Sequence, residues 1–136
     1  MRFAAFMKIV NRKNIKPIED ACGKLQELYN SKNLSLSYSV INNSSKPHKH
    51  KKMEEVYFVV KGKAKFKIGN SIFPIRAGDA FSIPKNEYHN IQDVEKTVEL
   101  VVVTNPKFDP SDLIYPSTSP AERDGAGFRT LNTRSG

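Results

Sequence analysis

The sequence has one cysteine, no tryptophan and no long apolar run. A single cysteine, Cys22, excludes an internal disulfide, so we expect a reducing, cytoplasmic location, and we interpret Cys22 as a packed thiol. No apolar stretch approaches the roughly 20 residues of a transmembrane helix, so a membrane protein is not expected. The opening residues are too short for a signal peptide, and Met7 is a candidate start alongside Met1.

Acidic residues are also in the minority, and the excess of positive charge is local. The net charge is +8, and eight lysines against two acidic residues lie between Lys46 and Lys67. Every second residue from Lys61 to Lys67 is a lysine, which is the period of a strand with one wet and one buried face. Aromatic residues fall on the opposite face, so nucleic acid is not an expected partner, whereas attraction of small anions remains open.

The length and the residue pattern predict one all-β domain. A chain of 136 residues, 38% apolar and 26% charged, suits a single globular domain. After residue 33, short alternating segments are separated by turns, as in a barrel or a sandwich. In Leu34–Ile41 the apolar residues, including Tyr38, are expected to point inward and the serines outward. Only Pro17–Tyr29 has a helical pattern, and residues beyond about 116 lack periodicity.

The three histidines and one glutamate could meet around a metal ion. His48 and His50 are two residues apart, so on a strand both can face the interior. Glu55 opens the next predicted strand, and His89 lies in a separate strand far downstream. Imidazole and carboxylate groups suit a divalent transition metal, but these residues do not select between manganese, iron, zinc, nickel and copper.

The spacing resembles the two motifs of the cupin superfamily. The first motif, a glycine, five residues, HxH, three or four residues, Glu, six residues and Gly, reads here Asn42, His48, His50, Glu55 and Gly62. The second motif reads Gly78, Pro84, Asn86, His89 and Asp93. Asparagine replaces two family glycines, at Asn42 and Asn86, and asparagine tolerates positive φ, so both turns can be retained.

The resemblance, strongest over residues 34–104, implies a small, single-domain cupin. We expect a double-stranded β-helix (jelly-roll) barrel over residues 17–115, a short N-terminal segment over residues 1–16 and a flexible tail over residues 116–136. It implies a strand rather than a helix over residues 22–33. It also implies a homodimer, formed through an outer sheet or an exchanged N-terminal strand.

The metal ligands implied by the resemblance are His48, His50, Glu55 and His89, which would hold one divalent transition metal ion. Tyr57 and Tyr38 are the inward polar candidates for a catalytic role, although each could equally be a core residue. The residues expected to line a small, largely apolar cavity are Phe66, Ile68, Phe81 and Val102.

Three functions remain open at this point. The favoured one is a metal-dependent enzyme acting on a small oxygen-bearing or anionic metabolite, with dioxygenase, decarboxylase or isomerase chemistry. A narrower alternative is a sugar-phosphate isomerase resembling the cupin phosphomannose isomerases, but no arginine clamp for phosphate is evident and Arg76 is expected at the surface. The third is a non-catalytic module that binds or senses a small ligand.

Overall fold

The computed structural model describes residues 7–117, and the chain folds there as an antiparallel β structure. One 3-10 turn, η1 (Arg12–Asn14), precedes the strands. The strands are β1 (Ile18–Asp20), β2 (Gly23–Ser31), β3 (Leu34–Ile41), β4 (Glu54–Ile68), β5 (Ser71–Arg76), β6 (Ala80–Ile83) and β7 (His89–Asn105). No helix within residues 7–117 is long and apolar enough to cross a membrane.

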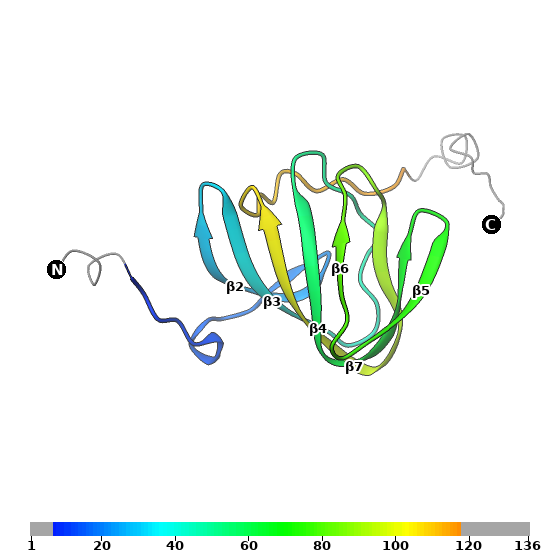
Figure 1. Cartoon of the computed structure of the whole chain (residues 1–136), viewed down its shortest axis with the longest axis horizontal. Coiled ribbons are helices and arrows are strands. Elements are labelled where there is room, and N and C mark those ends of the chain that lie inside the picture. Colours follow the sequence, from blue (N-terminus) through cyan, green and yellow to red (C-terminus); the bar gives the residue numbers. More distant parts are fainter. Residues whose placement is uncertain (1–6, 118–136) are drawn as a thin grey trace.

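The sheet curves into an open barrel around the long strands β4 and β7 (Figure 1). The strand order is β1-β2-β3-β7-β4-β5, with β6 also paired to β4. The β4–β7 ladder runs from Glu54 opposite Asn105 to Ile68 opposite His89, so these two strands pass through both halves of the barrel. This architecture confirms the predicted jelly-roll barrel.

The helix suggested by the pattern of residues 17–29 is wrong, because this segment forms strand β1 and most of strand β2. The strand implied by the cupin resemblance is correct. Strand β2 pairs with β1 on one side and with β3 on the other, and this pairing overrides the weak helical periodicity. Gly23 begins β2 with φ of 97°, and a Cβ there would lie 2.6 Å from the Val40 carbonyl oxygen. The close approach of β3 therefore requires glycine at this position.

The alternation predicted for β3 is correct, but its phase is inverted. Ser35, Ser37 and Ser39 are buried, whereas Leu36 and Tyr38 are only half-buried on the outer face. The outer face of the sheet is itself apolar, since Val56 and its neighbours on β4 alternate with the buried residues. An apolar pattern therefore could not tell the two faces apart.

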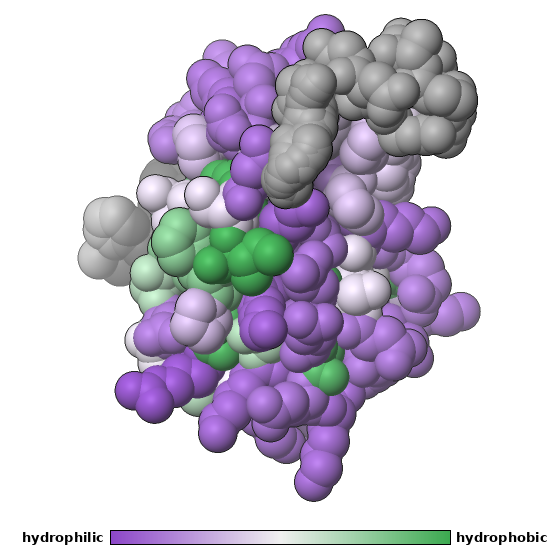
Figure 2. Space-filling view, turned by 90° about the vertical axis from the view of Figure 1, so that its right-hand side faces the viewer, coloured by the Kyte–Doolittle hydropathy of each residue, from purple (hydrophilic) through white to green (hydrophobic). Residues whose placement is uncertain are grey.

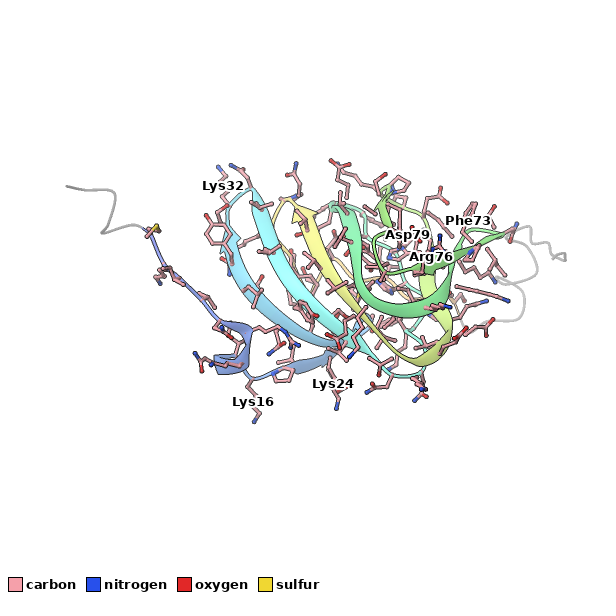
Figure 3. The ribbon with its side chains drawn as sticks, turned by 60° about the horizontal axis from the view of Figure 1, so that its bottom comes forward. Lys16, Lys24, Lys32, Phe73, Arg76 and Asp79 are labelled. Carbon is pink, nitrogen blue, oxygen red and sulfur yellow. The ribbon has the colours of Figure 1, made fainter. Side chains whose placement is uncertain are left out.

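The core fills the barrel between the two halves. It consists of Ile41, Tyr57, Val59, Ala64, Phe66, Ile75, Ile83, Ile91, Val98, Leu100 and Val102. The lysines of the second half of β4 point away from this core, as the period of two predicted. Lys16, Lys24 and Lys32 also project outward from the ribbon (Figure 3).

The two asparagines at the family's glycine positions behave differently. Asn86 has φ of 66°, as expected for a residue that replaces a turn glycine. Asn42 is not among the described residues with positive φ, so this position does not use the tolerance of asparagine for that conformation. Instead the Asn42 side-chain oxygen accepts a hydrogen bond of 2.6 Å from the Thr97 hydroxyl.

Beyond β7 the chain pairs with the segment between His48 and His50. The last backbone pairing joins Ile114 to Lys49 in both directions, at 2.9 and 3.0 Å. The predicted tail over residues 116–136 lies outside the described residues from residue 118 onward. Residues 7–11 extend away from the barrel at the other end (Figure 1).

Candidate metal centre

A short backbone bridge brings His48 next to His89. The His48 amide donates to the His89 carbonyl at 3.1 Å, and the His89 amide donates back at 2.9 Å. The two imidazole rings then lie with their centroids 4.4 Å apart. Residues 41 positions apart in the sequence are thereby fixed side by side at the start of β7.

All four predicted ligands come together in the barrel interior. One ligand atom from each of His48, His50, Glu55 and His89 lies within 4.8 Å of every other. All four side chains are buried, none with more than 3% of its surface exposed. Glu55 is held opposite Ile83 on β6 and Thr104 on β7, which fixes its inward direction.

Main-chain carbonyls fix the tautomer of every histidine in the group. The Nδ1 atoms of His48, His50 and His89 lie 2.6, 2.6 and 2.9 Å from the carbonyl oxygens of Lys46, Asp112 and Glu87. Because a carbonyl oxygen only accepts, each Nδ1 carries a hydrogen and donates it. In the neutral ring the free lone pair is therefore on Nε2, which is the atom that a metal would use.

Three atoms of the group have no hydrogen-bond partner among the described residues. They are His50 Nε2, His89 Nε2 and Glu55 Oε1. Both nitrogens lie close to the carboxylate oxygen, at 3.3 and 3.2 Å, without hydrogen-bond alignment. Buried polar atoms without partners are costly, and an ion between them would satisfy all three at once. The residues present thus fit a divalent metal ion.

The neighbours and the burial of these side chains shift their pKa values in different directions. Burial alone would raise the pKa of Glu55, but contact with His50 and His89 outweighs it and lowers that pKa to about 2. Burial, together with the neighbouring His89, lowers the pKa of His48 to about 4. Burial opposes protonation of His50 as well, yet Glu55 raises the pKa of His50. At neutral pH the group therefore offers a carboxylate and a neutral His48.

Asp112 holds the loop that follows His50 through hydrogen bonds to its backbone amides. The sequence analysis did not identify this residue. One carboxylate oxygen accepts the Lys51 amide at 2.8 Å, and the other accepts the amides of Lys52 and Met53 at 2.9 and 3.1 Å. The Asp112 carbonyl also accepts the hydrogen of His50 Nδ1. The only signal in the sequence was the loose resemblance of the segment after the barrel to cupins, which does not single out one aspartate.

The two tyrosines proposed as catalytic candidates occupy different sides of the sheet. Tyr57 is 2% exposed and faces inward, with its hydroxyl 3.4 Å from the Cys22 sulfur. Tyr38 is not inward, which corrects the expectation. Its hydroxyl donates to Glu99 at 2.5 Å, and the Arg12 guanidinium lies 4.0 Å from its ring centroid on the outer face.

An apolar pocket lies beside the aromatic residues next to the metal group. It has a volume of about 470 Å³, and its lining includes Phe66, Ile68 and Phe81 but not Val102, which is buried in the core. Phe66 also packs against His89, with ring centroids 6.1 Å apart. None of the four metal-group residues lines this pocket, and Phe66 connects the two because it lines the pocket and contacts His89.

The remaining lining of this pocket comes from β5, from β6 and from Asp79 in the turn between them. Strands β5 and β6 share no ladder within residues 7–117. Phe73 on β5 belongs to this lining and is exposed, so the pocket extends toward the surface there. Figure 2 shows an apolar patch bordered by hydrophilic residues on this side of the molecule.

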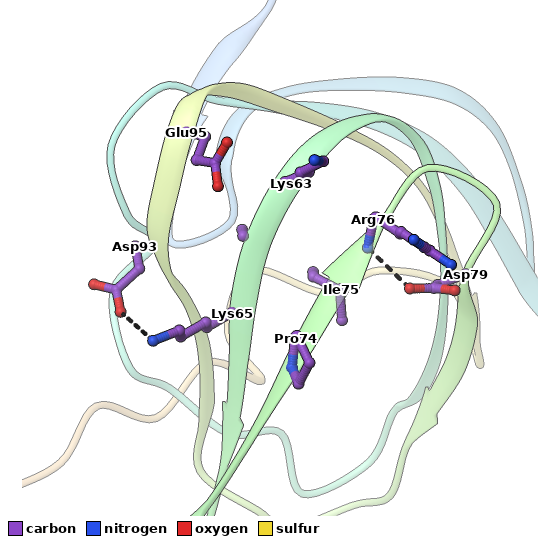
Figure 4. A pocket seen from close by; sticks show the side chains of 9 residues that line it. Lys63, Lys65, Pro74, Ile75, Arg76, Asp79, Asp93 and Glu95 are labelled. Atoms are coloured by element: carbon purple, nitrogen blue, oxygen red, sulfur yellow. Dashed lines mark hydrogen bonds and ion pairs between the residues drawn. The ribbon is translucent and has the colours of Figure 1, made fainter.

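A second pocket, of about 530 Å³, lies on the lysine-rich part of β4 (Figure 4). Its charged residues are Lys63, Lys65, Arg76, Asp79, Asp93 and Glu95. Lys65 lies 3.5 Å from Asp93, and the Arg76 amide donates to Asp79 at 2.8 Å. The two signs balance, and none of the four metal-group residues lines this pocket.

Comparison with known proteins identifies related sequences and folds. A family model described as "Cupin domain" matches residues 40–104. An uncharacterized protein of Methanocaldococcus jannaschii is 29% identical over 69 residues, which are 49% of this chain and 55% of that protein. The chain therefore spans about half the length of the curated relative that it matches.

Two solved structures share the fold. A protein from Planctomyces limnophilus has a TM-score of 0.72 at 22% identity, over 82% of this chain and 99% of that one. The polyketide cyclase RemF from Streptomyces resistomycificus has a TM-score of 0.70 at 18% identity, over 91% of this chain and 95% of that one. At these identities the likeness is one of fold.

Proposed function

The barrel of this chain is a cupin domain, and on that basis we propose that the protein is a metal-dependent enzyme acting on a small oxygen-bearing or anionic metabolite. The observation that carries the proposal is the convergence of three buried Nε2 atoms and one carboxylate, in which His50 Nε2, His89 Nε2 and Glu55 Oε1 have no hydrogen-bond partner among the described residues. Four protein ligands can leave positions open on a five- or six-coordinate ion, which favours catalysis over a closed structural site.

The residues of the chain have separable tasks in this proposal. His48, His50, Glu55 and His89 would hold the ion, with each histidine oriented by a main-chain carbonyl. A bound divalent ion supplies Lewis acidity, which polarises an oxygen of the substrate. The buried side chains around the group exclude water, which strengthens every charge interaction inside.

The apolar pocket suggests the kind of substrate. Phe66 and Phe81 stack with centroids 4.5 Å apart, and both line the pocket. Asp79 is the one charged residue in its lining. We expect a substrate with an apolar body that rests on these rings and an oxygen-bearing end that points toward His89.

The sugar-phosphate alternative receives less support from the described residues. A phosphate clamp needs unbalanced positive charge beside the metal group. The basic residues Lys63, Lys65 and Arg76 are instead matched by acidic neighbours and line a separate pocket. A non-catalytic sensing module would bind the metal and the ligand but show no turnover, and the experiment below separates it from an enzyme.

We also propose that two copies pair through the outer face of the sheet. Val56, Phe58 and Val60 on β4 are between 40% and 45% exposed and alternate with core residues. Val101 and Val103 lie beside Phe58 and Val56 in the ladder. Such an exposed apolar face on a curved sheet is typical of a subunit contact.

Elemental analysis of protein purified without a histidine tag tests the metal centre. We expect about one transition metal ion per wild-type chain and none in the H48A/H50A double variant, with the strand signal in circular dichroism retained. Lys49→Ala, between the two histidines, is the matched control and should keep its metal. Equal metal in the wild type and the double variant would show that the site is wrong.

The identity of the metal then directs the assays. Iron would favour oxygen chemistry, zinc would favour isomerisation and manganese would leave decarboxylation open. Turnover of a small apolar acid or enol in a panel of candidate substrates, lost in the double variant, would support the enzyme. Saturable ligand binding without turnover would instead support a sensing module.

A further inference from the structure

Thr104 is a buried threonine whose hydroxyl has no hydrogen-bond partner within residues 7–117. It is 2% exposed and lies near the end of β7. The three buried residues that precede it on the same face of β7 are apolar: Val98, Leu100 and Val102. Burying a hydroxyl without a partner is unfavourable, and valine has nearly the same shape as threonine without that cost. Threonine at this position is therefore favourable only where its hydroxyl gains a partner.

Thr104 lies directly opposite Glu55 in the β4–β7 ladder, and both side chains are buried. Residues that face each other in an antiparallel ladder have Cβ atoms about 4.5 to 5.5 Å apart, so a hydroxyl on one can reach a carboxylate on the other. On its other side Thr104 pairs with Ser35 of β3. The Ser35 hydroxyl has one hydrogen and donates it to Glu27 at 3.2 Å, so Ser35 does not serve as a donor to Thr104.

Glu55 is held differently from the three histidines of the metal group. Each histidine is oriented by a main-chain carbonyl at Nδ1. In the part of the chain that the structure describes, no residue outside the metal group donates a hydrogen bond to the Glu55 carboxylate. Its Oε1 atom lies 3.3 and 3.2 Å from the Nε2 atoms of His50 and His89, so Oε1 is the oxygen placed to bind an ion. Ligating carboxylates are normally hydrogen-bonded as well, and Oε2 is the atom left to accept.

We propose that Thr104 is the positioning residue for Glu55: in the metal-loaded protein its hydroxyl donates a hydrogen bond to Glu55 Oε2 while Oε1 binds the ion. This inference rests on the metal centre proposed above. Rotation about the side-chain torsions of Glu55 and Thr104 brings the two groups together, so that two neighbouring buried groups satisfy each other. The bond also restricts Glu55 to one oxygen on the ion, which keeps a coordination position free for a substrate.

Zinc affinity, measured by competition with a chromophoric chelator, tests the proposal. We expect Thr104→Val to weaken zinc binding by about tenfold or more, the usual effect of losing the partner of a metal ligand. Thr104→Ser keeps a hydroxyl at the position, so its affinity should stay within about threefold of the wild type. Thr97→Val is the matched control and should bind zinc as the wild type does. Thr97 also lies on β7, but its hydroxyl bonds Asn42 at an exposed position.

The stability of the zinc-free protein separates positioning from a structural role. Because the Thr104 hydroxyl has no partner there among the described residues, Thr104→Val should raise the midpoint of urea unfolding, opposite to its effect on zinc binding. A hydroxyl that serves the fold would lower both. A Thr104→Val protein that is less stable than the wild type, or that fails to fold, therefore overturns the proposal.

A double-variant comparison tests whether Thr104 acts through Glu55. In a Glu55→Ala background the three histidines can still hold zinc, and Thr104→Val should have no further effect there because the carboxylate is gone. An equal loss in both backgrounds would show that Thr104 acts on another group and would overturn the proposal. A Thr104→Val variant that binds zinc as tightly as the wild type overturns the role of Thr104 but leaves the metal centre intact. Wild-type protein that binds no zinc overturns both.

Discussion

The main-chain carbonyl of Asp112 accepts a hydrogen bond of 2.6 Å from His50 Nδ1, although the two residues are 62 positions apart. The same residue accepts three backbone amides of the loop after His50 through its carboxylate. The segment that follows the barrel is thus part of the metal centre's support, because it sets both the position and the tautomer of one ligand.

Replacing Asp112 by alanine should therefore weaken the metal centre from a distance. Three backbone amides lose their acceptor, that of buried Met53 among them, which we expect to lower the free energy of unfolding by about 3 kcal/mol. Displacement of the His50 loop should weaken metal affinity by about 10- to 100-fold. Urea denaturation and competition with a chelator measure the two effects. Asp109→Ala, a half-buried aspartate of the same segment whose carboxylate bonds only Ser111 among the described residues, is the control, and an equal loss in both variants would contradict the role of Asp112.

Two glycines of similar φ allow backbone strain to be separated from steric overlap. Gly62 and Gly78 have φ of 95° and 97°, but a Cβ at Gly62 would lie 2.1 Å from the Thr97 carbonyl oxygen, whereas Gly78 has nothing within 4 Å. We expect Gly78→Ala to cost about 1 kcal/mol of stability and Gly62→Ala more than about 3 kcal/mol. Denaturant unfolding of both variants checks this, and similar losses would mean that the bulge at Gly62 relaxes freely.

The metal-free protein should lose stability as the pH falls from about 6.5 to 4. The folded pKa of His48, about 4, lies below its ordinary value of 6.5, so the unfolded chain binds the proton first in this window. Stability from this source is complete above pH 6.5 and falls by about 2 to 3 kcal/mol at pH 4.5. The pKa of His50 is raised instead, so the stability that His50 contributes is lost as the pH rises above 6.5.

Urea unfolding of chelator-treated protein at pH 7 and pH 4.5 measures this loss. His48→Gln removes the titrating ring, so the difference between the two pH values should shrink in that variant. The pKa of Glu55 is lowered to about 2, so the stability that Glu55 contributes is lost mainly below pH 4.5. Between pH 7 and pH 4.5 the change in stability therefore comes mainly from His48. A variant with the undiminished pH dependence of the wild type would contradict this assignment.

The outer-face pairing is open to a direct test by light scattering. We expect the wild type to be a dimer, and Phe58→Glu to be a monomer, because a buried carboxylate in an apolar contact is strongly unfavourable. Metal content should be unchanged, since Phe58 points away from the barrel interior. Lys61→Glu, exposed on the same strand, is the control. A wild-type monomer at micromolar concentration would refute the pairing.

The sequence predicts the ligand set because strand geometry and motif spacing carry it. Residues two apart on one strand share a face, which places His48 with His50, and the resemblance supplies Glu55 and His89. The structure brings these four side chains together. In β3 the period of two is observed, but it assigns the wrong face to the interior. The outer face carries Leu36 and Tyr38, so its residues look like those of a core face.

The residues that support the site were beyond the reach of the sequence for a different reason. Cys22 lies 26 positions from His48 and Asp112 lies 62 positions from His50, and neither belongs to a motif. Their contacts arise only when the barrel closes and brings the turn before β2 and the segment after β7 to one place. Local pattern rules contain no information about such closure.

The main-chain partners of the three imidazoles also bear on how this centre could diversify. A carbonyl oxygen is common to all twenty amino acids, so substitution at position 46 or 87 alters a side chain but leaves the acceptor itself in the chain. Residues that line a ligand site can therefore change during evolution without changing the orientation of these imidazole rings. Only a change in the path of the backbone would remove the carbonyl acceptor from the imidazole.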